Sequence, residues 1–236
     1  ACVVCRYGGM KLKTVWVVMN SQPIEKVVDD GEVEVVDIWK SIQGEGVLCG
    51  LRCTFIRLAG CNLQCVHCDT NYTSGRMTLS VESIVETCKT LGCELVVITG
   101  GEPFRQLIVY KLIDTLLEVG FLVQCESNGT LFRKELWNTK ATLVVSPKSG
   151  KVNHDIIPFV LCWKVIVDHR YFTDWSTFAL LGCEGRVFRP ECDKSLIYLI
   201  PCDNDQYDLN VQCCVNMVLK HGFRLGLQVH KLVGVK

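Results

Sequence analysis

The sequence predicts an α/β fold in which βα units repeat around a parallel sheet. From residue 33 onward, short runs rich in β-branched residues alternate with segments of helical periodicity. Polar and glycine-rich motifs follow these runs, as expected for a site at the carboxyl ends of parallel strands. With 236 residues, 49% of them hydrophobic, the chain is long enough to bury a core, and it contains no internal repeat or low-complexity linker.

The expected elements follow from β-branched runs, helical periodicity and capping residues. Strands are expected at 52–58, 94–99, 121–125, 142–145, 163–167, 195–200 and 223–228. Helices are expected at 81–91, 106–119 and 208–221. Ser80 is the expected N-cap of the first helix, with Glu82 or Ser83 in its first turn, and Gly120 closes the second helix.

One core domain is expected, preceded by a segment of different character. Residues 1–30 are predicted to form a disordered N-terminal extension, and residues 31–236 the core domain. The first eighteen residues match no pattern downstream, and Met10 or Met19 is the expected start of the natural chain. Cys2 and Cys5 in this segment would bind zinc only with two further ligands from elsewhere.

Charge and cysteine content exclude several classes of protein. The chain has 25 basic and 25 acidic residues, so no net field draws it to nucleic acid or a membrane, and a small molecule is the expected partner. Its 16 cysteines do not indicate a disulfide scaffold, which is typical of secreted chains below about a hundred residues. The apolar run at 15–19 is too short for a signal peptide, and no run approaches the roughly 20 residues of a membrane span. A reducing cytoplasm and mostly free thiols are expected.

The most informative motif is C-x3-C-x2-C, formed by Cys61, Cys65 and Cys68. Three thiolates on one loop suit a four-iron cluster with one iron left open, whereas iron–sulfur electron carriers normally use four cysteines. An open iron suggests a reactive ligand, and S-adenosylmethionine, held through its amino and carboxylate groups, is the candidate. Two alternatives stay open. One is half of a zinc site, which lacks a second tightly spaced pair, and the other is an electron carrier completed by a distant cysteine.

Polar motifs follow the next predicted strands in chain order. Gly100-Gly101-Glu102-Pro103 follows one strand, and its missing side chains would let the backbone approach a ligand. Glu126 and Asn128 follow the next strand, and Ser146 and Lys148 the one after. Each motif alone is also explained as an ordinary turn. Together, after a cysteine loop and at the ends of successive strands, they predict one site.

These motifs resemble the radical S-adenosylmethionine superfamily and, within it, the 7-carboxy-7-deazaguanine synthase family. The resemblance runs from about residue 35 to the C-terminus, and the ordered set is far more specific than any single motif. The segments that carry it are 41–46 (SIQGEG), 55–63 (FIRLAGCNL), 68–70 (CDT), 98–103 (ITGGEP), 126–129 (ESNG), 146–148 (SPK) and 228–231 (QVHK).

The resemblance implies a lyase that converts 6-carboxy-5,6,7,8-tetrahydropterin to 7-carboxy-7-deazaguanine with loss of ammonia, in the biosynthesis of 7-deazapurines such as queuosine. It implies a partial, modified (β/α) barrel of the radical S-adenosylmethionine type, whose C-terminus helps to bind the substrate. The implied cofactors are a 4Fe-4S cluster, S-adenosylmethionine and Mg²⁺. A homodimer and an external electron donor of the flavodoxin or ferredoxin type are also expected, without a nucleic-acid or membrane partner.

The resemblance also assigns roles to individual residues. The cluster would be bound by Cys61, Cys65 and Cys68. S-adenosylmethionine would be held by His67, Gly100, Gly101, Glu102, Ser127, Ser146 and Lys148. Mg²⁺ would meet the Thr70 hydroxyl. The pterin would be bound by Gln43, Gly44, Glu45, Arg57, Glu126, Asn128, Gln228 and His230.

Some of these roles keep an alternative. Arg57 is expected to grip the substrate carboxylate with its forked guanidinium, but a surface ion pair would also explain it. A helix cap is a less favoured alternative for Thr70, whereas His67 would serve equally as a hydrogen-bonded loop residue. His230 would also be explained as a frayed terminal residue. A glycyl-radical activase would share the cysteine loop, but it would have no need of the Gln-Gly-Glu-Gly motif.

The chain also departs from the family pattern at several places. Ser127 stands where the family commonly has Thr, which keeps the hydroxyl, so no change of chemistry is expected. The loop at 71–76 is short, and 168–194 contains no recognisable motif. The surplus cysteines, including Cys49 and Cys53, form no second cluster pattern.

Overall fold

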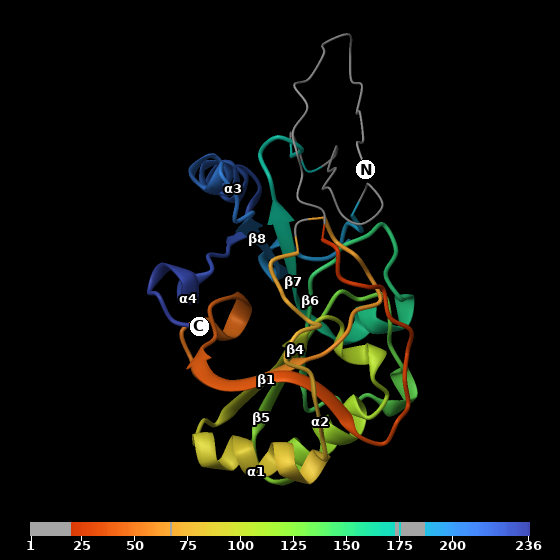
Figure 1. The fold of residues 1–236 in the computed structure, drawn as a ribbon. Coiled ribbons are helices and arrows are strands. Elements are labelled where there is room, and N and C mark those ends of the chain that lie inside the picture. The colour runs from red at the N-terminus through yellow and green to blue at the C-terminus, as the bar shows by residue number, and fades with distance from the viewer. Residues whose placement is uncertain (1–19, 67, 173–174, 176–186) are drawn as a thin grey trace.

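The computed structural model describes residues 20–66, 68–172, 175 and 187–236 (Figure 1). Within these residues, the chain forms one mixed sheet of nine strands, together with α-helices and short 3-10 turns. The strands are β1 (Val33–Ile42), β2 (Arg52–Leu58), β3 (Met77–Leu79), β4 (Leu95–Gly100), β5 (Leu122–Ser127), β6 (Thr142–Val145), β7 (Val160–Val167), β8 (Ile197–Pro201) and β9 (Arg224–Leu225). The helices are α1 (Val81–Leu91), α2 (Val109–Glu118), α3 (Tyr207–His221) and α4 (Val229–Leu232).

The strand order shows how the sheet is wound. The order is β3-β1-β2-β4-β5-β6-β7-β8-β9, so the parallel strands β2 and β4 to β9 lie side by side in chain order. In a doubly wound sheet the order reverses at a switch point, whereas a (β/α) barrel adds each strand beside the preceding one. The predicted α/β fold is confirmed, with the winding of a partial barrel to which β1 and β3 add an antiparallel edge.

Several predicted elements agree with the structure in detail. The bounds of β2, β6 and α1 are those expected, and Ser80 caps α1 by accepting a hydrogen bond from Ser83 N at 3.1 Å. α2 begins at Val109 rather than at 106, because the chain after β4 first makes a 3-10 turn at Pro103–Arg105. The strand expected at 223–228 is confined to β9, because the chain then turns to pair with Gly44 and enters α4.

β1 and β3 are absent from the prediction. β1 mixes apolar residues with Asp37 and Lys40, so its own pattern is weak. Its strand conformation follows from antiparallel pairing with β2 along most of its length and with β3 at its beginning. β3 pairs with β1 from more than thirty residues away in the sequence, and the local pattern of neither strand reveals that pairing.

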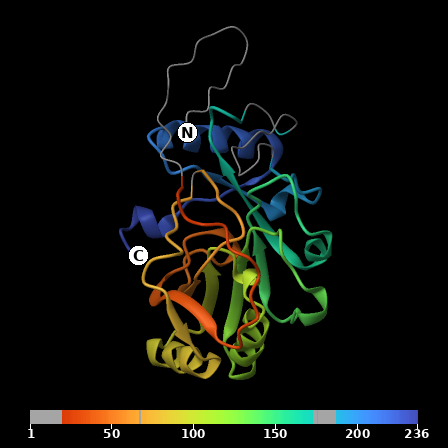
Figure 2. The same ribbon diagram turned by 45° about the vertical axis from the view of Figure 1, so that its right-hand side comes forward.

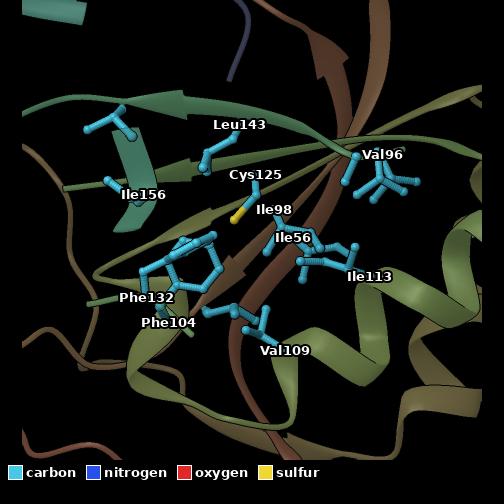
Figure 3. Packing of buried hydrophobic residues seen from close by; sticks show 14 of the residues in the cluster. Ile56, Val96, Ile98, Phe104, Val109, Ile113, Cys125, Phe132, Leu143 and Ile156 are labelled. Carbon is cyan, nitrogen blue, oxygen red and sulfur yellow. The ribbon is translucent and has the colours of Figure 1, made fainter. Parts of the chain in front are cut away.

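Side chains alternate between the two faces of the sheet. Ile56, Ile98, Cys125 and Leu143, from neighbouring strands, lie in one core with Ile113 of α2 (Figure 3). Full burial of one such aliphatic side chain stabilises the fold by roughly 1.5–3 kcal/mol. α1 and α2 lie together at one end of the molecule and α3 at the other (Figure 2). The intervening residues of the parallel strands face the opposite side of the sheet, where the cavity lies.

The segment before β1 is in contact with the core. Residues 1–19 lie outside the described residues, but residues 20–28, which we call the strap, run along the cysteine loop. Glu25 N donates to Cys61 O at 2.7 Å, and Val28 forms a parallel bridge with Gln106. The domain boundary expected at residue 30 stays a prediction, and the part of the extension that the structure describes is bound to the core.

Candidate active site

A cavity of about 320 Å³ opens at the carboxyl ends of the parallel strands. Most of the residues predicted for the site contribute to its wall. They are Gln43, Glu45, Arg57, Cys61, Cys65, Cys68, Thr70, Gly100, Gly101, Glu126, Ser127, Asn128, Ser146, Lys148, Gln228 and His230. Glu102 and Gly44 are not part of the wall, and His67 lies outside the described residues. The volume is typical of small-molecule sites.

Two glycines let β4 pack against the base of the cysteine loop. At Gly100, whose φ is 143°, an added Cβ would lie 2.3 Å from Leu58 O. At Gly101 an added Cβ would lie 1.9 Å from Gly60 O. Gly101 N also donates to Leu58 O at 3.2 Å, and Glu102 N to Gly60 O at 3.0 Å. The glycines are therefore required by the neighbouring backbone, whatever ligand the backbone also approaches.

The three cysteines lie on the loop that these contacts hold. Cys61 is 7% exposed, and Cys65 and Cys68 are half-buried. Among the residues that the structure describes, no three His, Cys, Asp or Glu side chains converge on a single ion. A 4Fe-4S cluster does not require such convergence, because each thiolate binds a different iron. The three thiolates on one loop fit three irons of such a cluster.

Glu102 lies behind the cavity wall and is fully buried. Its carboxylate accepts hydrogen bonds from Ser127 Oγ (2.8 Å), Asn128 N (2.7 Å) and Phe104 N (3.1 Å). The resemblance assigns Glu102 to S-adenosylmethionine, whereas the structure places it beneath two residues that face the cavity. Burial raises the pKa of Glu102 to about 7, although these hydrogen bonds favour the ionised form.

The Glu102→Gln substitution is expected to remove the part of the pH dependence of the unfolding free energy that comes from Glu102. The pKa of Glu102 is higher in the folded chain than in the unfolded chain. The stability that protonated Glu102 contributes to the folded chain is therefore lost as the pH rises from about 4.5 through 7. Between pH 5 and 8, the free energy of unfolding of the wild type should fall by about 2 kcal/mol relative to the variant. Urea titrations of the cluster-free chains measure this, with the exposed Glu135→Gln as control. Parallel pH profiles for wild type and Glu102→Gln would contradict the raised pKa.

A buried lysine joins two of the predicted carboxylates. Lys164, on β7, places its Nζ 2.6 Å from Glu45 Oε2 and 2.8 Å from Glu126 Oε2. Gln43 donates to the other oxygen of Glu126 at 3.0 Å, and Gln228 donates to the other oxygen of Glu45 at 2.8 Å. We call these five residues the polar cluster.

Lys164 and Glu45 of the polar cluster are both ionised, although burial disfavours either charge. Burial alone would raise the pKa of Glu45, but the charge and hydrogen bond of Lys164 lower it to about 2. Burial alone would lower the pKa of Lys164, but Glu126 and Glu45 raise it. The sequence prediction missed Lys164, although a single charged residue inside the apolar run of β7 was a usable signal.

Arg57 faces the cavity from β2 and is oriented by an aromatic ring. Its guanidinium carbon lies 4.9 Å from the centre of the Trp39 ring, which stacks on Phe55 with 5.1 Å between ring centres. Its Nε is buried and has no hydrogen-bond partner among the described residues. A planar cation with an unused donor fits a carboxylate. Trp39 lies on β1, so a strand missing from the prediction sets the direction of this arginine.

The C-terminal segment closes one side of the cavity. An added Cβ on Gly44 would lie 1.9 Å from His230 Nδ1, so Gly44 makes room for that ring instead of facing the ligand. Lys231 Nζ lies 2.8 Å from Asp69 and 2.7 Å from Asp203, which ties the segment to the cysteine loop and to the end of β8. His230 is therefore held on the cavity and is not a frayed end. Burial lowers its pKa, which favours a neutral imidazole at pH 7.

Thr70 and the Ser-Pro-Lys motif also lie where the site requires them. Thr70 is in the cavity wall and no helix begins at it, so the helix-cap alternative is wrong. Lys148 Nζ lies 2.6 Å from Ser146 Oγ, which brings a cation and a hydroxyl together. The two motifs face the same cavity from different strand ends.

Comparisons with known proteins bear on the family to which this chain belongs. The model of the radical SAM superfamily matches residues 49–150. The 7-carboxy-7-deazaguanine synthase of Methanospirillum hungatei is 41% identical over 209 residues, which cover 86% of each chain. That of Rickettsia prowazekii is 35% identical over 227 residues, which cover 88% of this chain and 91% of the relative. This chain belongs to the 7-carboxy-7-deazaguanine synthase family.

A solved structure shows the same fold as this member of the 7-carboxy-7-deazaguanine synthase family. The crystal structure of QueE from Escherichia coli matches with a TM-score of 0.64, covering 84% of this chain and 94% of that chain, at 23% identity. The likeness confirms the fold, and the match to the superfamily model identifies it as the radical SAM type. No helix in the described part of the chain is long and apolar enough to cross a membrane.

Proposed function

We propose that this chain is a radical S-adenosylmethionine lyase that converts 6-carboxy-5,6,7,8-tetrahydropterin to 7-carboxy-7-deazaguanine with loss of ammonia. The product would enter the biosynthesis of 7-deazapurines such as queuosine. The observation that carries the proposal is one cavity whose wall combines three cysteines, a lysine–serine pair and the polar cluster. Beside them lies Arg57, whose Nε has no hydrogen-bond partner among the residues that the structure describes. The activity named for the two relatives is the same.

One side of the cavity fits the cofactors. Cys61, Cys65 and Cys68 would bind three irons of a 4Fe-4S cluster and leave the fourth iron for S-adenosylmethionine. The Lys148 cation and the Ser146 hydroxyl would meet the carboxylate of its methionine part. When bound, these cofactors would supply a carbon radical that takes a hydrogen atom from carbon 6 of the pterin.

The other side would orient the pterin. The guanidine-like edge of a pterin carries N–H donors, which fit the carboxylates of Glu45 and Glu126 that Lys164 holds in place. Arg57 would bind the substrate carboxylate at the opposite end. Two fixed ends leave one orientation of the ring and present carbon 6 to the cofactor side. A ligand without these donors would exclude water from the remaining lone pairs of the two carboxylates without giving them hydrogen bonds, which disfavours its binding.

Further expectations extend the proposal. The Thr70 hydroxyl would be one of the few protein ligands of Mg²⁺, which otherwise keeps substrate oxygens and waters. The chain would act as a homodimer and take its electron from a flavodoxin or ferredoxin. A reducing cytoplasm would suit it, because exposed cysteines such as Cys49 and Cys192 are free thiols.

An iron–sulfur electron carrier is the alternative from another class. One observation favours it, because Cys202 also lines the cavity and would serve as a fourth ligand. A carrier, however, has no use for Arg57 held over a tryptophan ring or for a buried ion pair between Lys164 and two carboxylates. The lyase accounts for these groups, so it is the better supported function.

Arg57→Met is expected to lower kcat/KM for the pterin about 100- to 1000-fold, because the substrate carboxylate loses its charged, forked partner. The affinity for S-adenosylmethionine should stay unchanged, since the predicted ligands of that cofactor lie on other strands. Initial rates at varied pterin concentration and titration of the reconstituted cluster with S-adenosylmethionine measure the two effects. Arg52→Met, at the exposed beginning of the same strand, is the control. Wild-type kinetics in Arg57→Met would remove Arg57 from the substrate site.

A further inference from the structure

The strap makes contacts that the proposed function does not use. Its inward residues recur at every third position, since Gln22, Glu25 and Val28 are half-buried while the residues between them are exposed. Three residues per turn is the period of an extended polyproline-like segment, and Pro23 favours that conformation. The strap, drawn in red, runs beside the orange loops that follow β2 (Figures 1 and 2).

Anchors at Glu25 and Val28 fix the strap to the core. The Arg105 side chain is 2% exposed, lies under the strap and pairs with Glu25 at 3.3 Å. Glu25 N donates to Cys61 O at 2.7 Å. Val28 N donates to Arg105 O at 2.8 Å, and Val28 O accepts from Leu107 N at 2.9 Å. Side-chain and backbone contacts together make the strap a fixed element that is able to hold other parts of the chain in place.

Gln22 connects the strap to both halves of the loop that carries the cysteines. Its Nε2 donates to Thr70 O at 2.9 Å, and its Oε1 accepts from Tyr72 N at 2.7 Å. Its backbone oxygen accepts from Gln64 Nε2 at 2.8 Å. The orientation of the Gln22 amide is fixed by its partners, because the Thr70 carbonyl only accepts and the Tyr72 N–H only donates.

We propose that Gln22 is a positioning residue that holds residues 70–72, the stretch of chain we call the Thr70 turn, against the cysteine loop and so fixes the Thr70 hydroxyl for Mg²⁺. This inference rests on the proposed function, which makes Thr70 a ligand of that ion. Mg²⁺ demands near-ideal octahedral geometry, so a ligand on an unsupported turn binds it weakly. One amide that bonds the backbone of residues 70 and 72 restrains the turn on both sides of the residue between them.

Two substitutions separate the two bonds of the Gln22 amide. Gln22→Ala removes both bonds, whereas Gln22→Glu keeps the acceptor for Tyr72 N and replaces the donor to Thr70 O by a second carboxylate oxygen. Gln212→Ala, on the exposed side of α3, is the matched control. Thermal unfolding of each variant shows that the fold is kept.

Hydrogen exchange of the cluster-free chain is the first readout, because it needs no cofactor. The Tyr72 amide should exchange about tenfold faster in Gln22→Ala, since its acceptor is lost. It should exchange at the wild-type rate in Gln22→Glu and in the control. An unchanged rate in Gln22→Ala would deny that Gln22 holds the turn and would overturn the proposal.

The Mg²⁺ requirement of the loaded enzyme is the second readout. Both Gln22 variants should need about tenfold more Mg²⁺ for half-maximal turnover, with an unchanged KM for S-adenosylmethionine. Faster exchange without a changed Mg²⁺ requirement would leave Gln22 a purely structural role and would also overturn the proposal. Failure of the proposed function is recognised in the wild type alone, as a fully loaded enzyme that leaves the pterin intact, and it would overturn the positioning role as well. A wild-type enzyme that turns over the pterin equally with and without Mg²⁺ would refute the Thr70 site, and the positioning role with it.

Discussion

Lys164→Met is expected to destabilise the folded chain by about 3–5 kcal/mol and to lower pterin turnover at least about 1000-fold. The side chain of Lys164 is 7% exposed and lies between the carboxylates of Glu45 and Glu126. Methionine has a similar length and no charge, so the substitution removes the cation with little change in packing. Two carboxylates would then face each other in a buried site. Without the cation, burial would favour protonation of Glu45, and the pterin edge would lose an ionised acceptor.

The effect of Lys164→Met should depend on pH in a defined direction. In the wild type the pKa of Glu45 is lowered from 4.5 to about 2, so this group contributes stability at higher pH that is lost as the pH falls through 4.5 toward 2. In the variant, burial acts without the opposing cation and raises the pKa. The free energy of unfolding of the variant should therefore fall as the pH rises from about 5 to about 8. These two pH values bracket the raised pKa that is typical of a buried carboxylate.

Urea titrations at both pH values, together with initial rates of pterin turnover, measure the consequences of Lys164→Met. The exposed Lys151→Met is the control, because it removes the same charge and adds the same side chain away from the polar cluster. Equal stability of Lys164→Met and wild type at the higher pH would contradict the role assigned to the cation.

Gly101→Ala is expected to destabilise the chain by about 3 kcal/mol or more and to prevent stable cluster assembly. The added Cβ would lie 1.9 Å from Gly60 O and 2.9 Å from the Cys61 Cβ. The first of these atoms belongs to the backbone, which has no rotamer to move away. The loop that carries Cys61 would therefore have to shift away from β4, and the cysteine at its start would shift with it.

A second glycine separates steric overlap from conformational cost in this experiment. Gly120 has a φ of 95° but no atom within 4 Å of an added Cβ. Gly120→Ala should therefore cost only about 1–2 kcal/mol, from the left-handed conformation alone, and should leave cluster loading unchanged. Denaturant titration and iron content of the reconstituted chains measure both effects. A Gly101→Ala chain that loads iron and unfolds like the wild type would contradict the proposed packing of β4 on the cysteine loop.

Local patterns predicted those parts of the fold that local forces decide. α1 is an amphipathic run with a serine cap, and its bounds and its Ser80 cap are confirmed. The site was predictable because its motifs follow successive parallel strands, whose carboxyl ends meet at one edge of a sheet. That is why Cys61, Glu126 and Ser146, far apart in the sequence, share one cavity.

The features that the sequence did not predict depend on contacts between distant residues. The buried charge of Lys164 in an apolar strand is stabilised by Glu45 and Glu126, which lie 119 and 38 residues away in the sequence. Glu102 belongs to the Gly-Gly-Glu-Pro motif, but its buried position behind the cavity wall depends on hydrogen bonds from Ser127 and Asn128. The strap has a weak pattern, and its structure follows from its partners.

Turnover of the pterin by the reconstituted enzyme is the decisive measurement for this chain. The chain would be loaded anaerobically with iron and sulfide and incubated with S-adenosylmethionine, a reductant, Mg²⁺ and 6-carboxytetrahydropterin, with the product identified by mass spectrometry. We expect 7-carboxy-7-deazaguanine, formed without stoichiometric consumption of S-adenosylmethionine. A well-loaded cluster that cleaves S-adenosylmethionine but leaves the pterin intact would contradict the substrate. A cluster that ignores S-adenosylmethionine would contradict the lyase and favour the electron carrier.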